Sequence, residues 1–294
     1  MTQTPVGTHA ETEHRLGVLL VLGAAVAWSV SGVFARLITV DVWTATSTRA
    51  LFAGLFMGIG LIAVHRGQSL AVALAMGRIG LFVACMAAVS MTSFTAAFYH
   101  TTVANVAVIY ALTPFIAAAL GWLILGETPS RRTMLAAGIA LVGVAIMVGG
   151  AIGGGTWVGD LLALSMSASF AVVAVIVRAN PRLEMLSTNG LGCLIAALIA
   201  APFARFETLD PSNASLLAAF AFASTPLAFF MFLAGARRIP AAKAALLVTI
   251  EVVLSPLWVF LFFAEVPNIL AIVGGAIVMA AVLWRIVGEL RGAG

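Results

Sequence analysis

The chain has 294 residues, of which 63% are hydrophobic and only 9% are charged, and its mean hydropathy is +1.15. Because soluble globular proteins carry about 25% charged residues, this composition excludes a soluble fold and predicts an integral membrane protein. The 15 Lys and Arg residues exceed the 11 Asp and Glu residues, but they stand singly or in pairs between apolar runs, so no nucleic-acid partner is expected. Cys85 and Cys193 lie in separate apolar runs, which supports neither a disulfide framework nor a metal site.

Ten apolar segments predict ten transmembrane helices, since about 20 apolar residues cross the hydrocarbon core of a bilayer. The segments between them contain proline, glycine, asparagine or charges, which hydrocarbon rejects. The predicted helices are 16–36, 44–64, 78–99, 103–125, 133–151, 158–178, 186–204, 214–235, 241–263 and 268–287. Residues 1–15 and 288–294 are predicted to be polar tails, and we expect the first 14 residues to be disordered.

The basic residues are distributed unequally between the two sides of such a bundle. With the N-terminus inside the cell, all but three of the 15 Lys and Arg residues lie at cytoplasmic helix ends. The exceptions are Arg36 and Arg205 on the outer side and Arg49 within a span. Cytoplasmic loops accumulate Lys and Arg, so both termini are predicted to be cytoplasmic, with the protein in the inner (plasma) membrane.

The chain also repeats itself, because residues 16–151 resemble residues 158–287. The segment 122–129 (WLILGETP) is similar to 260–267 (FLFFAEVP), and Ser47-Thr48-Arg49 is similar to Ser187-Thr188-Asn189. Each copy holds five predicted helices, an odd number, so the second copy crosses the membrane in the opposite orientation. This is the inverted-repeat design of secondary transporters.

A set of short motifs runs through both copies. They are Trp28 and Phe34 in the first helix, Arg49 in the second, Pro114-Phe115 in the fourth with Gly126-Glu127 directly after it, and Glu251-Val252-Val253 in the ninth with Ala264-Glu265 directly after it. With these motifs, essentially the whole chain resembles EamA-type members of the drug/metabolite transporter superfamily. The resemblance implies an all-α integral membrane fold, with two inverted five-helix repeats around a central cavity. It also implies export of amino acids or related metabolites, and aromatic amino-acid exporters are among the similar proteins.

One position departs from the pattern of that superfamily. Val252 stands where the family usually has proline, and Pro256 follows it in the same helix. The resemblance therefore does not locate the bend of the ninth helix. We predict Pro114 and Pro256 as the hinges, since proline frees carbonyl groups that line cavities or permit bending in transporters.

Glu251 is the most informative single residue. It lies about ten residues into the ninth helix, roughly 15 Å from its inner end and close to the bilayer midplane. A charge at this depth costs roughly 2.5–3.5 kcal/mol on insertion scales, so such a group normally faces water, a partner or a substrate. We interpret Glu251 as a contact for a substrate ammonium or for a transported proton, and a structural hydrogen bond is the alternative.

Arg49 lies about five residues, roughly 7–8 Å, into the second helix from its outer end. Its guanidinium can bind a carboxylate with two parallel hydrogen bonds, and that carboxylate is either Glu251 or part of the substrate. The alternative is that the side chain extends to the outer membrane interface. If Arg49 and Glu251 face one cavity, an amino-acid zwitterion has a partner for each of its charges.

Aromatic and hydroxyl side chains at helical spacing complete the predicted substrate-binding site. Its members are Arg49, Glu251, Trp28, Tyr99, Tyr110, Trp258, Thr95 and Ser255. Aromatic walls would hold the apolar part of a metabolite while a few polar groups orient it. Ordinary helix packing is the alternative for any single aromatic residue. Glu127 and Glu265 are instead expected to stabilise the first turn of the helix that follows each of them.

The sequence therefore predicts a secondary transporter that exports amino acids and related small metabolites by alternating access, with no cofactor. The only lysine, Lys243, precedes Ala244, which excludes a phosphate-binding loop for ATP. The histidines near the spans, His65 and His100, lie at helix ends, so no enzyme is expected. Export of drug-like organic cations or nucleotide sugars is the alternative, and a channel is less favoured. Proton coupling, the exact substrate and the oligomeric state are left open, and a monomer is allowed.

Overall fold

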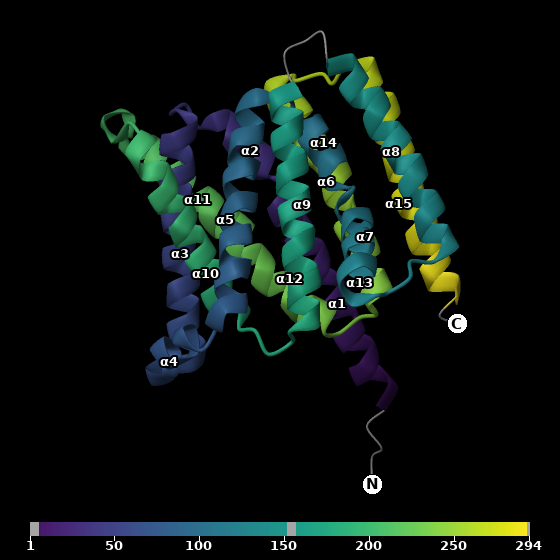
Figure 1. Cartoon of the computed structure of the whole chain (residues 1–294), viewed down its shortest axis with the longest axis horizontal. Coiled ribbons are helices and arrows are strands. Elements are labelled where there is room, and N and C mark those ends of the chain that lie inside the picture. Colours follow the sequence, from purple (N-terminus) through teal and green to yellow (C-terminus); the bar gives the residue numbers. More distant parts are fainter. Residues whose placement is uncertain (1–5, 152–156, 293–294) are drawn as a thin grey trace.

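The structure is a computed structural model that describes residues 6–151 and 157–292, and nearly all of these residues are helical. The helices run between two faces of one bundle (Figure 1). Helix α1 (Val6–Ser29) begins and α15 (Ile269–Gly292) ends at one face, which we call the terminal face. Within the described residues, nine helical stretches are long and apolar enough to cross a membrane. Helix α8 (Arg131–Ala151) runs beside α15 as a further traverse, so the predicted all-α membrane fold is confirmed.

Five of the predicted spans are single helices, and a sixth adds only a short turn. The single helices are α3 (Val42–His65), α5 (Gly77–His100), α8, α9 (Trp157–Ala179) and α15. Helix α10 (Met185–Ala200) ends in the 3-10 turn Ala201–Phe203, and α4 (Ser69–Leu74) is a short helix after α3. Because α1 begins at Val6, the expectation of disorder is wrong for residues 6–14 of the predicted polar tail, and Glu13 in this segment pairs with Arg238 at 2.9 Å.

The other four spans are interrupted. The pairs are α1 with α2 (Ser31–Leu37), α6 (Val103–Tyr110) with α7 (Thr113–Leu125), α11 (Pro211–Phe222) with α12 (Ala228–Ala236), and α13 (Ala241–Val248) with α14 (Ile250–Phe263). A π turn that contains Pro226 joins α11 to α12. The ring of a proline inside a helix removes one backbone hydrogen bond and crowds the preceding turn, which accounts for this irregular segment.

The two halves share local geometry as well as sequence. Helix α7 ends at Gly126 with a φ of 70°, and α14 ends at the equivalent Ala264 with a φ of 52°. The interruption at Ala111 and Leu112 between α6 and α7 corresponds to the one at Thr249 between α13 and α14. The two segments run in opposite directions through the bundle (Figure 1). These features support the inverted repeat.

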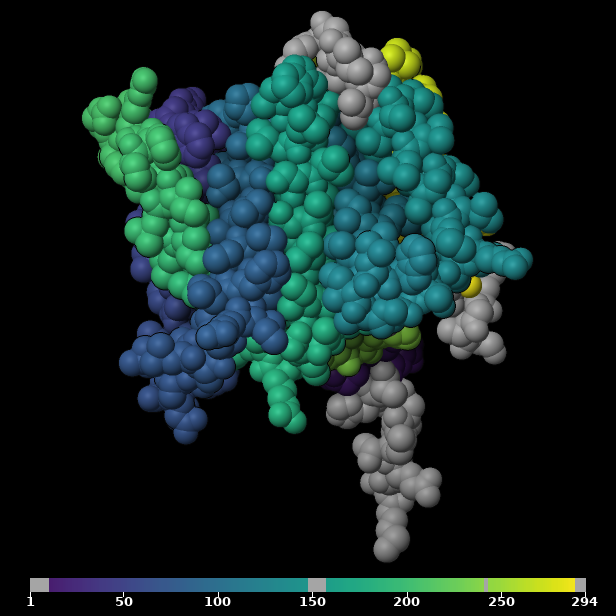
Figure 2. Space-filling model, in the orientation of Figure 1, coloured from purple at the N-terminus to yellow at the C-terminus, as the bar shows by residue number. Residues whose placement is uncertain are grey.

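The main helix pairs each join one half to the other. They are α8 with α15, α5 with α9, α3 with α10, α5 with α10, and α1 with α12. Helices α8 and α15 approach each other closely at two glycines, where a Cβ on Gly143 would lie 2.7 Å from the carbonyl oxygen of Gly274. Small residues let transmembrane helices approach in this way. Figure 2 shows one flank of the bundle, where α5, α9, α7 and α8 follow one another.

Each half also begins its second span with an acidic cap. The Asp41 carboxylate accepts hydrogen bonds from the backbone N–H groups of Trp43 and Thr44 at the start of α3, and Glu184 caps α10 in the same way. Burial acts to raise the pKa of Asp41, but hydrogen bonds from the Thr44 hydroxyl and from these backbone groups outweigh it and hold the pKa below its ordinary value. The charged form of Asp41 therefore stabilises the start of α3.

Candidate functional site

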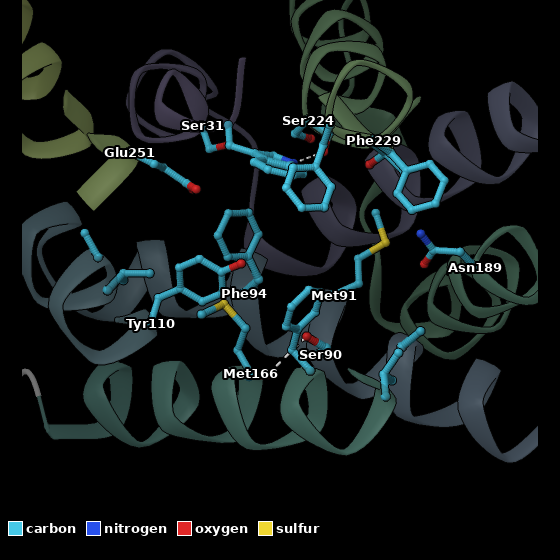
Figure 3. Close-up of a pocket in the computed structure, with 18 of the residues that line it drawn as sticks. Ser31, Ser90, Met91, Phe94, Tyr110, Met166, Asn189, Ser224, Phe229 and Glu251 are labelled. Atoms are coloured by element: carbon cyan, nitrogen blue, oxygen red, sulfur yellow. Dashed lines mark hydrogen bonds between the residues drawn. The ribbon is translucent and has the colours of Figure 1, made fainter. Parts of the chain in front are cut away.

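A cavity of about 350 Å³ lies between the two halves. Its wall is mostly apolar and includes the phenylalanines 94, 98, 170, 229 and 232 and the methionines 91, 166 and 185. A few polar side chains interrupt this wall, and Figure 3 shows those of Ser31, Ser90, Tyr110, Asn189, Ser224 and Glu251 around it. Apolar walls with few polar groups are typical of sites for small molecules.

Arg49 reaches this cavity from α3 and is only 4% exposed. Its two terminal nitrogens donate hydrogen bonds to the hydroxyls of Thr95 and Ser224, both at 3.1 Å, and its guanidinium carbon lies 4.1 Å from the centroid of the Phe220 ring. Its Nε is buried without a hydrogen-bond partner, and none of the ion pairs among the described residues includes Arg49. The side chain therefore does not extend to the interface, and its charge has no anionic partner here.

Glu251 lines the same cavity from the first turn of α14. Its carboxylate points into the space enclosed by the labelled side chains of Figure 3. Among the part of the chain that the structure describes, no hydrogen bond or ion pair involves Glu251. An amino-terminal helix end favours negative charge nearby, and the interruption at Thr249 creates such an end beside the cavity.

Three further predicted site residues line the cavity, namely Trp28, Tyr110 and Ser255. The Trp28 indole N–H donates a hydrogen bond of 3.0 Å to the carbonyl oxygen of Ser224, which fixes the ring against the wall. Tyr110 is the last residue of α6, directly before the interruption that precedes α7. The two interrupted spans thus bring Tyr110 and Glu251 to the same cavity.

The other three predicted site residues do not line the cavity. The Thr95 hydroxyl lies behind it and accepts a hydrogen bond from Arg49. The Tyr99 hydroxyl donates to the carbonyl oxygen of Val40 at 2.9 Å, and the Trp258 indole donates to the Ser29 hydroxyl at 3.0 Å. Sequence spacing places Trp258 and Glu251 on the same face of their helix. That face contacts both the cavity and α1, and the Trp258 ring lies against α1 rather than in the cavity.

The two predicted hinge prolines differ in their position. Pro114 is in the first turn of α7, just after the interruption of its span. Pro256 lies inside the continuous helix α14, whereas the interruption of that span is at Thr249. Proline fits the first turn of a helix, where its missing N–H has no intrahelical partner, so Pro114 occupies a natural starting position.

Sequence reasoning missed several cavity residues that the structure reveals. Asn189 lines the cavity from α10, and the repeat match between Arg49 and Asn189 could have identified it. Ser224 was not predicted, although it holds Arg49 and lies within the π turn. The phenylalanines of the wall carry no signal of their own, because phenylalanine is common in every membrane span.

The two ends of the cavity differ in their exposure. Phe98 and Val103, at the end away from the terminal face, are 4% and 1% exposed. Towards the terminal face, the lining includes Ala174, which is exposed, and Val177 and Met185, which are half-buried. The cavity is therefore closed at the face opposite the termini and reaches the surface towards the terminal face.

The fold and the cavity together define a class of protein. A membrane bundle of two inverted halves that enclose one cavity is the architecture of a transporter. Consistent with this class, the family model described as "EamA-like transporter family" matches residues 15–149 and 157–286. The chain belongs to the EamA-like transporter family.

Comparison with solved structures supports the same fold. One structure, described only as "Crystal structure of protein", is 19% identical with a TM-score of 0.63, and the match covers 92% of this chain and 96% of that one. At this identity the likeness concerns the fold alone. A search of the curated proteins gave no match.

Proposed function

We propose that this membrane transporter exports amino acids and related small metabolites across the inner membrane by alternating access. The observation that carries the proposal is that one basic and one acidic side chain, not paired with each other, line the same cavity. Arg49 and Glu251 both line the cavity, and neither is paired with the other or with another charged side chain of the described residues. A zwitterion supplies a carboxylate for the first and an ammonium for the second.

The apolar wall is suited to the remainder of such a substrate. The cavity of about 350 Å³ falls in the range of roughly 300–1,000 Å³ that small-molecule sites occupy. Aromatic rings and methionines surround it, so an apolar side chain of the substrate would lose contact with water on binding. We therefore expect amino acids with large apolar side chains to be preferred over small or highly charged ones.

Organic cations are the second candidate, since Glu251 and the aromatic rings could bind a positive charge. Arg49 argues against them, because a buried guanidinium in the same wall repels a cation. Nucleotide sugars carry two phosphates, yet Arg49 is the only basic residue among the described residues that line the cavity. The charges of the wall thus favour a zwitterion over either alternative.

Counterflow in proteoliposomes tests this proposal. The purified protein is loaded with unlabelled amino acid, and uptake of the labelled compound is measured against competing zwitterions and organic cations, with and without a pH gradient. Saturable counterflow that zwitterions inhibit is expected. Inhibition by organic cations alone would establish the second candidate, and flux without saturation would indicate a channel.

The orientation of the protein can be tested separately. Because basic residues concentrate at the terminal face, we propose that both termini are cytoplasmic. Reporters fused after Gly67, Arg131 or Arg238 should then be cytoplasmic, and those fused after Asp41 or Asp210 should be external. A reproducible inversion at one of these sites would contradict the proposed topology.

A further inference from the structure

Two arginine–glutamate pairs occupy equivalent positions in the two halves of the bundle. Arg36 lies in the last turn of α2 and pairs with Glu265, which follows α14. Arg178, in the last turn of α9, pairs with Glu127, which follows α7. Each pair joins an arginine of one half to the glutamate of the other. The sequence repeat aligns the two arginines with each other and the two glutamates with each other.

The Arg36–Glu265 pair lies at the face opposite the termini and makes several contacts. Arg36 Nε and Glu265 Oε2 are 2.7 Å apart, and the guanidinium also donates to the carbonyl oxygens of Phe98 and Thr101. The second oxygen of Glu265 accepts the backbone N–H of Val103 at 3.0 Å, at the start of α6. The expectation that Glu265 stabilises the helix after it is therefore wrong, because Asn268 caps α15 instead.

This cluster, formed by Arg36, Glu265 and the backbone from Phe98 to Val103, ties α2, α5, α6 and the end of α14 together. We call it the closed latch. It lies directly beside Phe98 and Val103, which line the buried end of the cavity. Its two charged side chains are 25% and 22% exposed.

The Arg178–Glu127 pair at the terminal face is looser. One hydrogen bond of 2.9 Å joins the two side chains, which are 69% and 44% exposed. No hydrogen bond among the described residues ties either side chain to the backbone between α12 and α13. We call this pair the open latch, and it lies beside Val177, where the cavity reaches the surface.

We propose that the two pairs are alternating latches, each of which closes one end of the cavity in one of the two conformations of the transport cycle. The inference rests on the alternating access of the proposed function. When the terminal face closes, Glu127 accepts the backbone N–H of Ala241 at the start of α13, and Arg178 donates to the carbonyl oxygens of Ala236 and Ile239. These groups are the repeat equivalents of those that hold the closed latch. The Arg36–Glu265 cluster separates in that conformation.

Cysteine labelling in lipid nanodiscs tests this inference. In a background that lacks Cys85 and Cys193, Val103→Cys reports on the end beside the closed latch, and Ala174→Cys reports on the end beside the open latch. Glu265→Gln removes the ion pair but keeps an oxygen for the Val103 N–H. Glu265→Gln should therefore increase maleimide labelling at Val103→Cys relative to labelling at Ala174→Cys. We expect this ratio to rise roughly tenfold, because one hydrogen bond between charged groups shifts an equilibrium by about that factor. Glu127→Gln should not raise that ratio.

Two further variants keep the result interpretable. Arg36→Gln leaves Glu265 free to accept the Val103 N–H at the start of α6 and should raise the ratio in the same direction, so the conclusion does not depend on one substitution folding correctly. Glu207→Gln, an exposed acid at the same face as the closed latch, should leave the ratio unchanged. An unchanged ratio in monodisperse Glu265→Gln and Arg36→Gln, or an equal rise in Glu127→Gln, overturns the proposal.

The labelling needs no substrate, so its outcome is separate from that of the transport assay. If the ratio responds as expected but no amino acid gives counterflow, the latches stand and the proposed substrate class is wrong. If counterflow is normal and the ratio does not respond, the substrate class stands and the latches are wrong.

Discussion

Replacing Arg49 with lysine separates its proposed role in binding from a role in folding. In the protein, the guanidinium is held by Thr95 and Ser224 and covered by the Phe220 ring. Lysine also carries one positive charge, so the net charge of the side chains that line the cavity is unchanged. It cannot donate two parallel hydrogen bonds to a carboxylate, because its ammonium is a compact point charge.

The size of the effect follows from what is lost. A hydrogen bond to a charged group contributes about 1.5–3 kcal/mol, so losing one of two bonds to the substrate carboxylate should weaken apparent affinity roughly 10- to 150-fold. The contact of the cation with the Phe220 ring contributes about 0.5–2 kcal/mol, and lysine retains part of it. We therefore expect the Arg49→Lys protein to remain folded and monodisperse.

Counterflow with two competitors measures this effect. The first competitor is an apolar amino acid, and the second is its carboxamide, which has the same ammonium and side chain but no carboxylate. Arg49→Lys should weaken competition by the amino acid and leave that by the carboxamide nearly unchanged. Arg131→Lys, at the exposed start of α8, is the matched control. Parent-like affinity for the amino acid, or an equal loss for both compounds, would refute the carboxylate-binding role.

The remaining predictions concern Glu251, Asp41 and the α8–α15 contact. Glu251→Gln should weaken the exchange of labelled amino acid, because the substrate ammonium loses its partner. If exchange persists but accumulation driven by a pH gradient is lost, Glu251 is a proton site instead. If both exchange and accumulation equal those of the parent, Glu251 does not belong to the site. Since the pKa of Asp41 is lowered in the folded protein, its stabilisation is complete above its unfolded pKa of about 4 and is lost as the pH falls through the folded value. Asp41→Ala should therefore lower the Tm near neutral pH, by a cap energy of about 1 kcal/mol, and the difference from the parent should shrink in acid; a pH-independent difference would contradict the capping role. Gly143→Val should destabilise the protein by about 1–3 kcal/mol because the side chain meets the Gly274 backbone, whereas Gly138→Ala on the same helix meets no atom within 4 Å and should be neutral in thermal unfolding.

Several features of the site followed from local sequence. The depth of Glu251 and Arg49 in apolar segments marked both as groups that need a polar or charged environment, and both line the cavity. Tyr110, which lines the cavity as well, stands one helical turn before Pro114, the predicted hinge. Such predictions are possible because a charge or a proline within a span is costly wherever the helix lies, so its presence is informative before any packing is known.

Other features depended on how the helices rotate against one another. Spacing assigns Trp258 to one face with Glu251, yet its indole contacts Ser29 rather than the cavity. Likewise, Glu265 was expected to stabilise the helix that follows it, and only the arrangement of α2, α6 and α14 brings it to Arg36 and Val103. The sequence contains both partners, but their distance in the chain says nothing about which backbone groups are within reach.

The sequence by itself determined that the chain is a helical membrane protein built from two inverted repeats, because hydrophobic length and odd-numbered repeats are properties of the chain alone. Tertiary structure decided which side chains face the cavity, where the spans are interrupted and which end of the cavity is closed. Apolar side chains gain little from facing another helix rather than lipid, so hydrophobicity does not fix the rotation of a span. Close glycine contacts and polar hydrogen bonds between helices fix it instead, and these form only when the halves come together.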